Sequence, residues 1–174
     1  MKLSLRWLKQ FVNIPENLSA QDLSNLITLH TAEVDGFENP AENFSNMVIG
    51  KIIELKPHPN ADKLRVCIVD IGKTGLDSQM DSDKKQISDS TKKVKIVCGG
   101  SNLYQNQLVA VALPGSKVRW HGEGDLITLE ATTIRGEDSY GMICASDEIG
   151  MGPSAKAEIM DLTHLDLPAG TPLA

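Results

Sequence analysis

Short apolar runs and alternating apolar and polar positions dominate this chain after residue 46, and they predict β-structure. Residues 47–55 and 64–71 are dense in Val and Ile, which favours two strands, while Pro57 and Pro59 favour a turn over 56–62. We therefore expect a hairpin. Because two prolines stiffen its turn, the polar side chains in and beside it are displayed at little entropic cost: His58, Asn60, Lys63 and Arg65. This polar tip indicates a binding surface.

Three further strands are predicted after the hairpin. Residues 94–98 and 108–113 are apolar runs, and 125–135 alternates between apolar and polar positions. Five short strands in this order match the partly open Greek-key barrel of the OB-fold, although an SH3-like barrel explains the number nearly as well. Between the second and third strands, residues 74–93 are polar and charged and predict a flexible insertion.

Helices are predicted only ahead of the first strand. Ser4 can cap a helix over 5–12, and Ser19 can cap a second helix, with Leu18 and Leu23 placed as a hydrophobic staple. The alternation over 33–37 then predicts a short strand.

Leucines recur between the prolines of the last segment, residues 159–174, so this segment needs a packing partner. We expect it to return onto the N-terminal helices. The predicted fold class is then mainly β: an OB-fold barrel over 41–150, inserted in a small discontinuous α+β domain that 1–40 and 151–174 form together.

The net charge of -6 argues against a generally basic nucleic-acid-binding protein, but the charge is unevenly distributed. Residues 47–73 carry 5 basic and 3 acidic side chains, whereas 126–174 carry 2 and 8. Any contact with a polyanion therefore belongs to the centre of the chain, and it should be weak and strongly salt-dependent.

The cysteines indicate a reducing compartment. Cys67, Cys98 and Cys144 lie far apart inside apolar runs, which is typical of small buried hydrophobic residues. No apolar run approaches the roughly 20 residues of a membrane span, and the N-terminus lacks the apolar region of a signal peptide. We expect a cytoplasmic protein.

RNA contact is better supported than catalysis. The four histidines are scattered, no HxxxH, GxSxG or Walker-type spacing occurs, and no cysteine pair has metal-ligand spacing, so we expect no catalytic residue, metal site or bound cofactor. Cationic and amide side chains near the predicted strands suit phosphate and 2′-hydroxyl groups. The candidate RNA-binding residues are Lys56, His58, Asn60, Lys63, Arg65, Asn102, Lys117, Arg119 and Arg135.

Several motifs occur in an order that resembles a known family. HPNADKLRVCIVDIG is followed by IVCGGSN, VALPG and TIRGEDSYGMICASDEIGM. Together they resemble the tRNA-binding OB domain of bacterial phenylalanyl-tRNA synthetase β subunits and of several tRNA-binding cofactors. The opening MKLSLRWLKQFVNI resembles the N-terminus of the β subunit itself. We therefore interpret the chain as an N-terminal fragment of a member of that family.

The resemblance implies part of an aminoacyl-tRNA synthetase. Such a synthetase is a heterotetramer of two α and two β chains that charges tRNA with phenylalanine, using ATP and magnesium. The family's aminoacylation site lies on α and its editing site in later β domains. The implied partners are therefore tRNA, the α subunit and a second β subunit, and not DNA or a membrane. The sequence departs from the family pattern at the insertion and at Trp120-His121-Gly122-Glu123-Gly124, where a more basic segment is expected.

Two other functions stay open at this point. The acidic net charge and an aromatic content of 4% favour a purely structural module that assembles the synthetase without binding RNA by itself. A barrel that binds a protein ligand is the third possibility.

Overall fold

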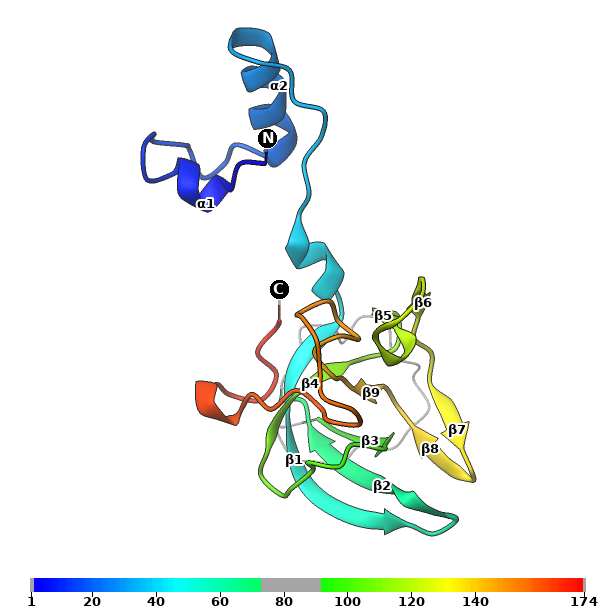
Figure 1. Cartoon of the computed structure of the whole chain (residues 1–174). Coiled ribbons are helices and arrows are strands. Elements are labelled where there is room, and N and C mark those ends of the chain that lie inside the picture. The colour runs from blue at the N-terminus through cyan, green and yellow to red at the C-terminus, as the bar shows by residue number, and fades with distance from the viewer. Residues whose placement is uncertain (1, 73–91, 174) are drawn as a thin grey trace, which may run out of the picture. The chain divides into compact units, whose positions relative to one another are not determined.

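The computed structural model describes residues 2–72 and 92–173 of the chain (Figure 1). It divides into two compact units, Met1–Asn39 and Pro40–Ala174. Most of the predicted insertion at 74–93 lies outside the described residues, although Lys93, its last residue, already begins a strand. Within the described part of the chain, every helix is too short or too polar to cross a membrane.

The N-terminal unit contains two helices, α1 (Leu5–Leu8) and α2 (Ala20–His30). The predicted cap of α2 is confirmed, because the Asp22 backbone N–H donates to Ser19 Oγ at 3.1 Å. α1 is shorter than predicted, and Ser4 makes no side-chain cap. The strand predicted at 33–37 is wrong: none of the described residues before 40 is in a strand, so this segment has no ladder to join.

An antiparallel sheet of five strands dominates the second unit (Figure 1). The strand order is β3-β2-β1-β4-β9, so the long strand β1 lies at the centre. The prediction of a mainly β fold is confirmed, and four of the five predicted strands occur in this sheet. The strands are β1 (Met47–His58), β2 (Ala61–Asp70), β3 (Lys93–Cys98), β4 (Leu108–Ala112) and β9 (Met142–Ile143).

The fifth predicted strand, 125–135, is wrong as a single strand of that sheet. It splits into β6 (Leu126–Thr128), which pairs with β5 (Lys117–Arg119), and β7 (Thr132–Ile134), which pairs with β8 (Glu137–Ser139). All three residues of β6 are exposed, so the alternation does not correspond to one buried face. Arg135 and Gly136, both with positive φ, then turn the chain sharply into β8.

The described sheet is open, so strand pairing does not close it into a barrel. Its edge strand β3 is instead linked to the end of β8 and to the residue that follows it. The Tyr140 N–H donates to Lys95 O at 2.8 Å, and the Val97 N–H donates to Ser139 Oγ at 3.0 Å. The OB-fold itself stays a prediction, as does the SH3-like alternative.

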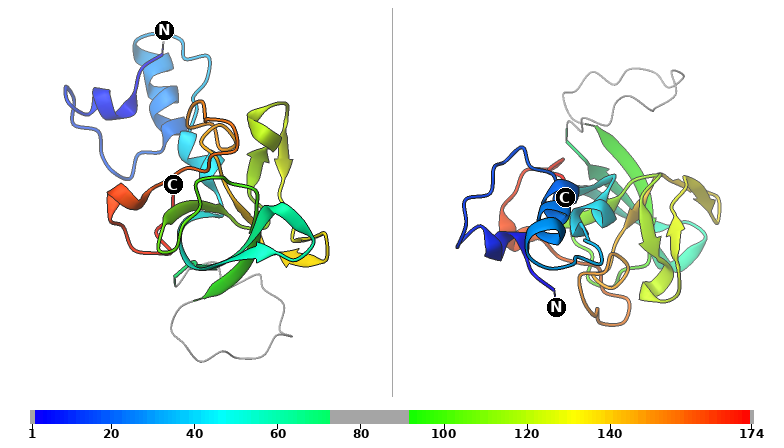
Figure 2. Two further views of the ribbon diagram at one scale, coloured as in Figure 1. Left: turned by 60° about the horizontal axis from the view of Figure 1, so that its bottom comes forward. Right: turned by 90° about the horizontal axis from the view of Figure 1, so that it is seen from above.

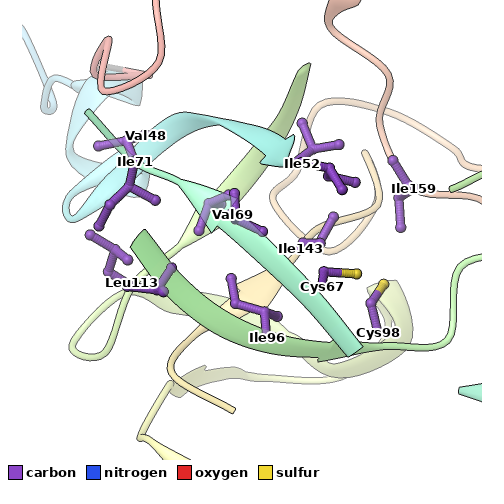
Figure 3. Close-up of a cluster of buried hydrophobic side chains, with 13 residues drawn as sticks. Val48, Ile52, Cys67, Val69, Ile71, Ile96, Cys98, Leu113, Ile143 and Ile159 are labelled. Carbon is purple, nitrogen blue, oxygen red and sulfur yellow. The ribbon is translucent and has the colours of Figure 1, made fainter. Parts of the chain in front are cut away.

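Two hydrophobic clusters form the core, one of which is shown in Figure 3. The expected burial of the three cysteines is confirmed. Burial raises the pKa of the Cys67 thiol to about 12 and that of Cys98 to about 11, and it also raises the pKa of Cys144. These thiols therefore stay protonated at neutral pH and pack as small hydrophobic groups.

Short 3₁₀ helices join some of these elements: η1 (Pro40–Phe44), η3 (Trp120–Gly122) and η4 (Thr163–Leu165). The last of them lies in the C-terminal segment, which is hydrogen-bonded to the sheet. The Gly170 N–H donates to Ile49 O, and the Leu173 N–H donates to Met47 O. The structure thus groups 151–174 with the sheet, and its predicted packing on 1–40 stays a prediction.

Asp161 ties this C-terminal segment to the loop before β4. Its Oδ2 accepts from the Tyr104 hydroxyl at 2.8 Å and from Gln107 Nε2 at 3.1 Å, and its Oδ1 accepts from the Thr163 N–H at 2.9 Å. Desolvation raises the pKa of Asp161, but these hydrogen bonds together outweigh it and hold the pKa below its ordinary value of 3.8.

This network predicts acid sensitivity. Because the folded pKa is the lower one, ionised Asp161 stabilises the fold above pH 3.8, and the contribution is lost as the pH falls through the folded pKa. We expect the urea concentration at the unfolding midpoint of the wild type to decrease as the pH is lowered through this range. For Asp161→Asn the decrease should be smaller. An equal decrease of the midpoint in the two proteins would contradict the stabilising role of ionised Asp161.

Candidate nucleic-acid interface

The β1–β2 hairpin is tighter than predicted. Regular pairing continues almost to its tip, and only Pro59 and Asn60 separate the strands. The turn predicted over 56–62 is therefore wrong in its extent, because the prolines do not exclude strand pairing there. The register shifts between Pro57 and His58, and such irregularities are where sheets tolerate a proline.

His58 fastens this tip to the turn between β7 and β8. Its ring is 5% exposed, and Nε2 lies 3.0 Å from Ile134 O, while Nδ1 accepts from the Asn60 N–H at 3.0 Å. Because Nδ1 is the acceptor, the proton lies on Nε2, which donates to Ile134. Asn60 Nδ2 adds a bond to Arg135 O at 2.9 Å. We call these four residues the clamp.

The clamp brings two hairpin tips together that are far apart in sequence. Figures 1 and 2 both show the β7–β8 hairpin beside the tip of β1 and β2. Arg135, with φ of 49°, carries an exposed side chain next to that tip. His58 and Asn60, predicted as RNA contacts, thus use their polar groups inside the chain, and their contact with RNA stays a prediction.

Cations surround the clamp. Lys63 is exposed and Arg65 half-buried on β2, and Arg65 Nη1 makes only a long 3.4 Å contact to Leu64 O and a 3.5 Å contact to Asp62 O. Within the described part of the chain, no carboxylate forms an ion pair with Lys63, Arg65 or Arg135. Their charges are therefore available to an anionic ligand.

The remaining candidates lie elsewhere. Asn102 clasps the C-terminal segment: its Nδ2 donates to Ile159 O at 3.0 Å, and its Oδ1 accepts from the Ile159 N–H at 2.9 Å. Lys117 and Arg119 lie on β5, and the Arg119 N–H donates to Glu148 O. The structure therefore gathers Lys56, His58, Asn60, Lys63, Arg65 and Arg135 around the two hairpin tips, whereas Lys117 and Arg119 lie on β5 and the Asn102 side chain is used inside the chain.

A groove of about 270 Å³ runs over the outer face of the sheet beside the clamp. Glu54, Ile68 and Lys95 lie opposite one another across β1, β2 and β3, and Lys56 lies opposite Val66 in a neighbouring row. We call this the sheet groove. It is lined by Glu54, Lys56, Pro57, Pro59, Val66, Ile68, Lys95 and Glu137.

Two ion pairs lie in the sheet groove. Lys56 Nζ lies 2.7 Å from Glu54 Oε1, and Lys95 Nζ lies 3.0 Å from Glu137 Oε2. Sequence reasoning missed Lys95 and Glu137, because they are 42 positions apart and only the fold brings them together. Among the described residues, no three potential metal ligands are grouped.

The β1–β2 hairpin resembles a known sequence family. A family model described as a putative tRNA binding domain matches residues 47–80, which include all of β1 and β2. Among solved structures, a MetRS related protein from Pyrococcus horikoshii covers 80% of this chain and 99% of its own, with 14% identity and a TM-score of 0.46. That likeness is too weak to support any argument.

Relatives extend the similarity to nearly the whole chain. The phenylalanine–tRNA ligase beta subunit of Chlorobium chlorochromatii is 34% identical over 153 residues, covering 87% of this chain and 16% of that protein. That of Syntrophus aciditrophicus is 35% identical over 174 residues, covering 100% and 18%. The chain thus spans less than a fifth of the length of these relatives. The predicted resemblance to the β-subunit family is confirmed.

Replacing His58 tests the clamp. His58→Ala removes the imidazole donor to Ile134 O at a half-buried position, which should cost about 1–3 kcal/mol. Hydrogen exchange measured by NMR should accelerate at the β7–β8 amides. Asn60→Ala removes only an exposed bond and should have a smaller effect. Unchanged protection in His58→Ala would show that the hairpin is held by other contacts.

Asn102 separates a structural role from an RNA-binding role. Asn102→Ala removes both hydrogen bonds to Ile159 and should lower the free energy of unfolding by about 1–3 kcal/mol. Chemical denaturation measures this loss, and RNA affinity should stay the same wherever the variant is folded. A weaker affinity at unchanged stability would instead assign Asn102 to the RNA contact.

Proposed function

We propose that this chain is the tRNA-binding part of a phenylalanine–tRNA ligase β subunit and that it contacts tRNA through the joined hairpin tips. The observation that carries the proposal is the clamp, which places Arg135 beside the cations of β2. The tRNA-binding family model matches the same hairpin. Its relatives by name are subunits of a tRNA ligase.

The chemistry of these tips suits an RNA backbone. Lys63, Arg65 and Arg135 offer donors without a carboxylate partner among the described residues, and phosphate oxygens accept from such donors. The net charge of -6 keeps the attraction local and weak at physiological salt. Lys56 joins this surface when a phosphate replaces Glu54 as its partner. Secondary contacts at most are left to Lys117 and Arg119, while Asn102 serves the fold.

An OB-type barrel is the fold that we propose for this unit. The antiparallel order of β1, β2, β3 and β4 supports it, together with the hydrogen bond from Tyr140 to Lys95 O that approaches closure from the other edge. In such barrels oligonucleotides bind the face of strands two and three and the adjoining loops. The clamp and the sheet groove lie on this side of the sheet.

The function of the whole subunit follows from its relatives as a proposal. In the cytoplasm, this chain would hold tRNA while the α subunit charges it with phenylalanine, in an assembly with a second β subunit. ATP and magnesium would serve the reaction on α. Nothing in the described part of this chain groups metal ligands, so we assign no step of that chemistry to it.

The purely structural alternative is less favoured. It predicts that the exposed cations at the tips have no role in affinity. It does not explain why a tRNA-binding family model matches the hairpin that carries two of them.

Removing the cations tests the proposal. Lys63→Ala and Arg65→Ala should each weaken tRNA binding by about 1 kcal/mol, roughly fivefold, and each should reduce the salt dependence by about one phosphate contact. Fluorescence titration of labelled tRNA at low and at physiological salt measures both quantities.

Lys156→Ala is the matched control for these variants. It removes an exposed cation from the same unit but from a segment outside both hairpins. Its effect on tRNA affinity should be several times smaller. Equal losses of tRNA affinity in all three variants would mean that the binding is general electrostatic attraction without a defined site. If the wild type binds no tRNA even at low salt, only an architectural role is left.

A further inference from the structure

The floor of the sheet groove is apolar although it faces away from the core. Val66 is 9% exposed and lies in neither core cluster, and Ile68 beside it is half-buried. The alternate residue Cys67 points to the opposite face and packs in the core. Val66 and Ile68 therefore form an apolar strip outside both core clusters, with most of its accessible surface on Ile68, and the rings of Pro57 and Pro59 border it.

The size of the groove limits what can lie on that strip. Its volume of about 270 Å³ is just below the roughly 300–1,000 Å³ of pockets that bury drug-sized ligands. A volume of this size matches one flat ring system. An RNA base that is unstacked from its neighbours has this shape, and single-stranded RNA is recognised through such bases.

The two ion pairs add polar groups at the margin of the strip. Each pair engages one carboxylate oxygen, Oε1 of Glu54 and Oε2 of Glu137. A carboxylate has about four lone-pair sites, so both can accept further hydrogen bonds. The lysines are 64% and 38% exposed, and a pair at such a site is worth about 0–1 kcal/mol, so they can turn to a phosphate at little cost.

We propose that the sheet groove binds one unpaired nucleotide of RNA, with its base on Val66 and Ile68, and that Glu54 and Glu137 favour bases with an exocyclic amino group. The inference rests on the proposed function and adds base selectivity to it. Cytosine presents an amino group at N4, which donates to a carboxylate, whereas uracil presents an acceptor at O4. The groove should therefore prefer cytosine to uracil.

Short oligocytidylate and oligouridylate of equal length test this preference, because their bases have the same size. We expect the wild-type chain to bind oligocytidylate about three- to tenfold more tightly at low salt, the difference made by one net hydrogen bond. In the double variant Glu54→Gln and Glu137→Gln the ratio should approach one. A glutamine amide donates to uracil O4 as readily as it accepts from cytosine N4.

Filling the groove is the second arm. Ile68→Phe occupies the strip and should weaken oligocytidylate binding about tenfold, whereas Ile127→Phe, on exposed β6, should leave it unchanged. Circular dichroism and thermal melts confirm that both variants are folded. If Ile68→Phe matches Ile127→Phe, or if the glutamine variant raises both affinities equally at an unchanged ratio, the groove proposal is overturned.

The same titrations with tRNA keep the two proposals apart. Salt-dependent tRNA binding that responds to Lys63→Ala but not to Ile68→Phe would leave the proposed function standing without the groove. Absence of tRNA binding by the wild type at low salt would overturn both.

Discussion

The hydrogen bond between buried His58 and Ile134 O is the constraint on which this surface depends. A two-stranded hairpin such as β7–β8 is marginally stable alone. The bond joins this hairpin to the central strand of the sheet across 76 positions of sequence. Because the buried imidazole would lose its partner if the turn moved, this bond fixes the turn, and the exposed side chain of Arg135 takes its position from that turn.

Elements with a local signal were predictable. Val- and Ile-rich runs identified β1 to β4, and Ser19 identified the start of α2, because these patterns act within a few residues. The fifth strand was misassigned because period-two alternation also occurs in short exposed ladders, where it marks no core face. The true fifth strand, β9, spans only two residues and carries no periodic signal.

The sequence indicated which polar residues lie near the candidate site, but not whether their side chains face a ligand or bond to the protein itself. His58, Asn60 and Asn102 are polar residues in loops or at strand ends, which is equally typical of ligand contacts and of hydrogen bonds to distant backbone. Their partners lie 57 to 76 positions away, and only packing decides between the two roles. For Lys63 and Arg65 the structure shows no carboxylate partner among the described residues, and their contact with RNA stays a prediction.

The division between unpaired and paired cations gives the surface two different tasks. In the proposed function, unpaired Lys63 and Arg65 would attract phosphate whatever the RNA sequence, so they would supply salt-sensitive affinity but little selectivity. Lys56 and Lys95 have their charges balanced by Glu54 and Glu137, so the groove attracts a backbone less and exposes its apolar floor to a base. Under the two proposals, an acidic protein would hold RNA through a few uncompensated charges at the tips. Contacts in the nearly neutral groove would depend on the shape and hydrogen-bonding edge of the base and would resist salt.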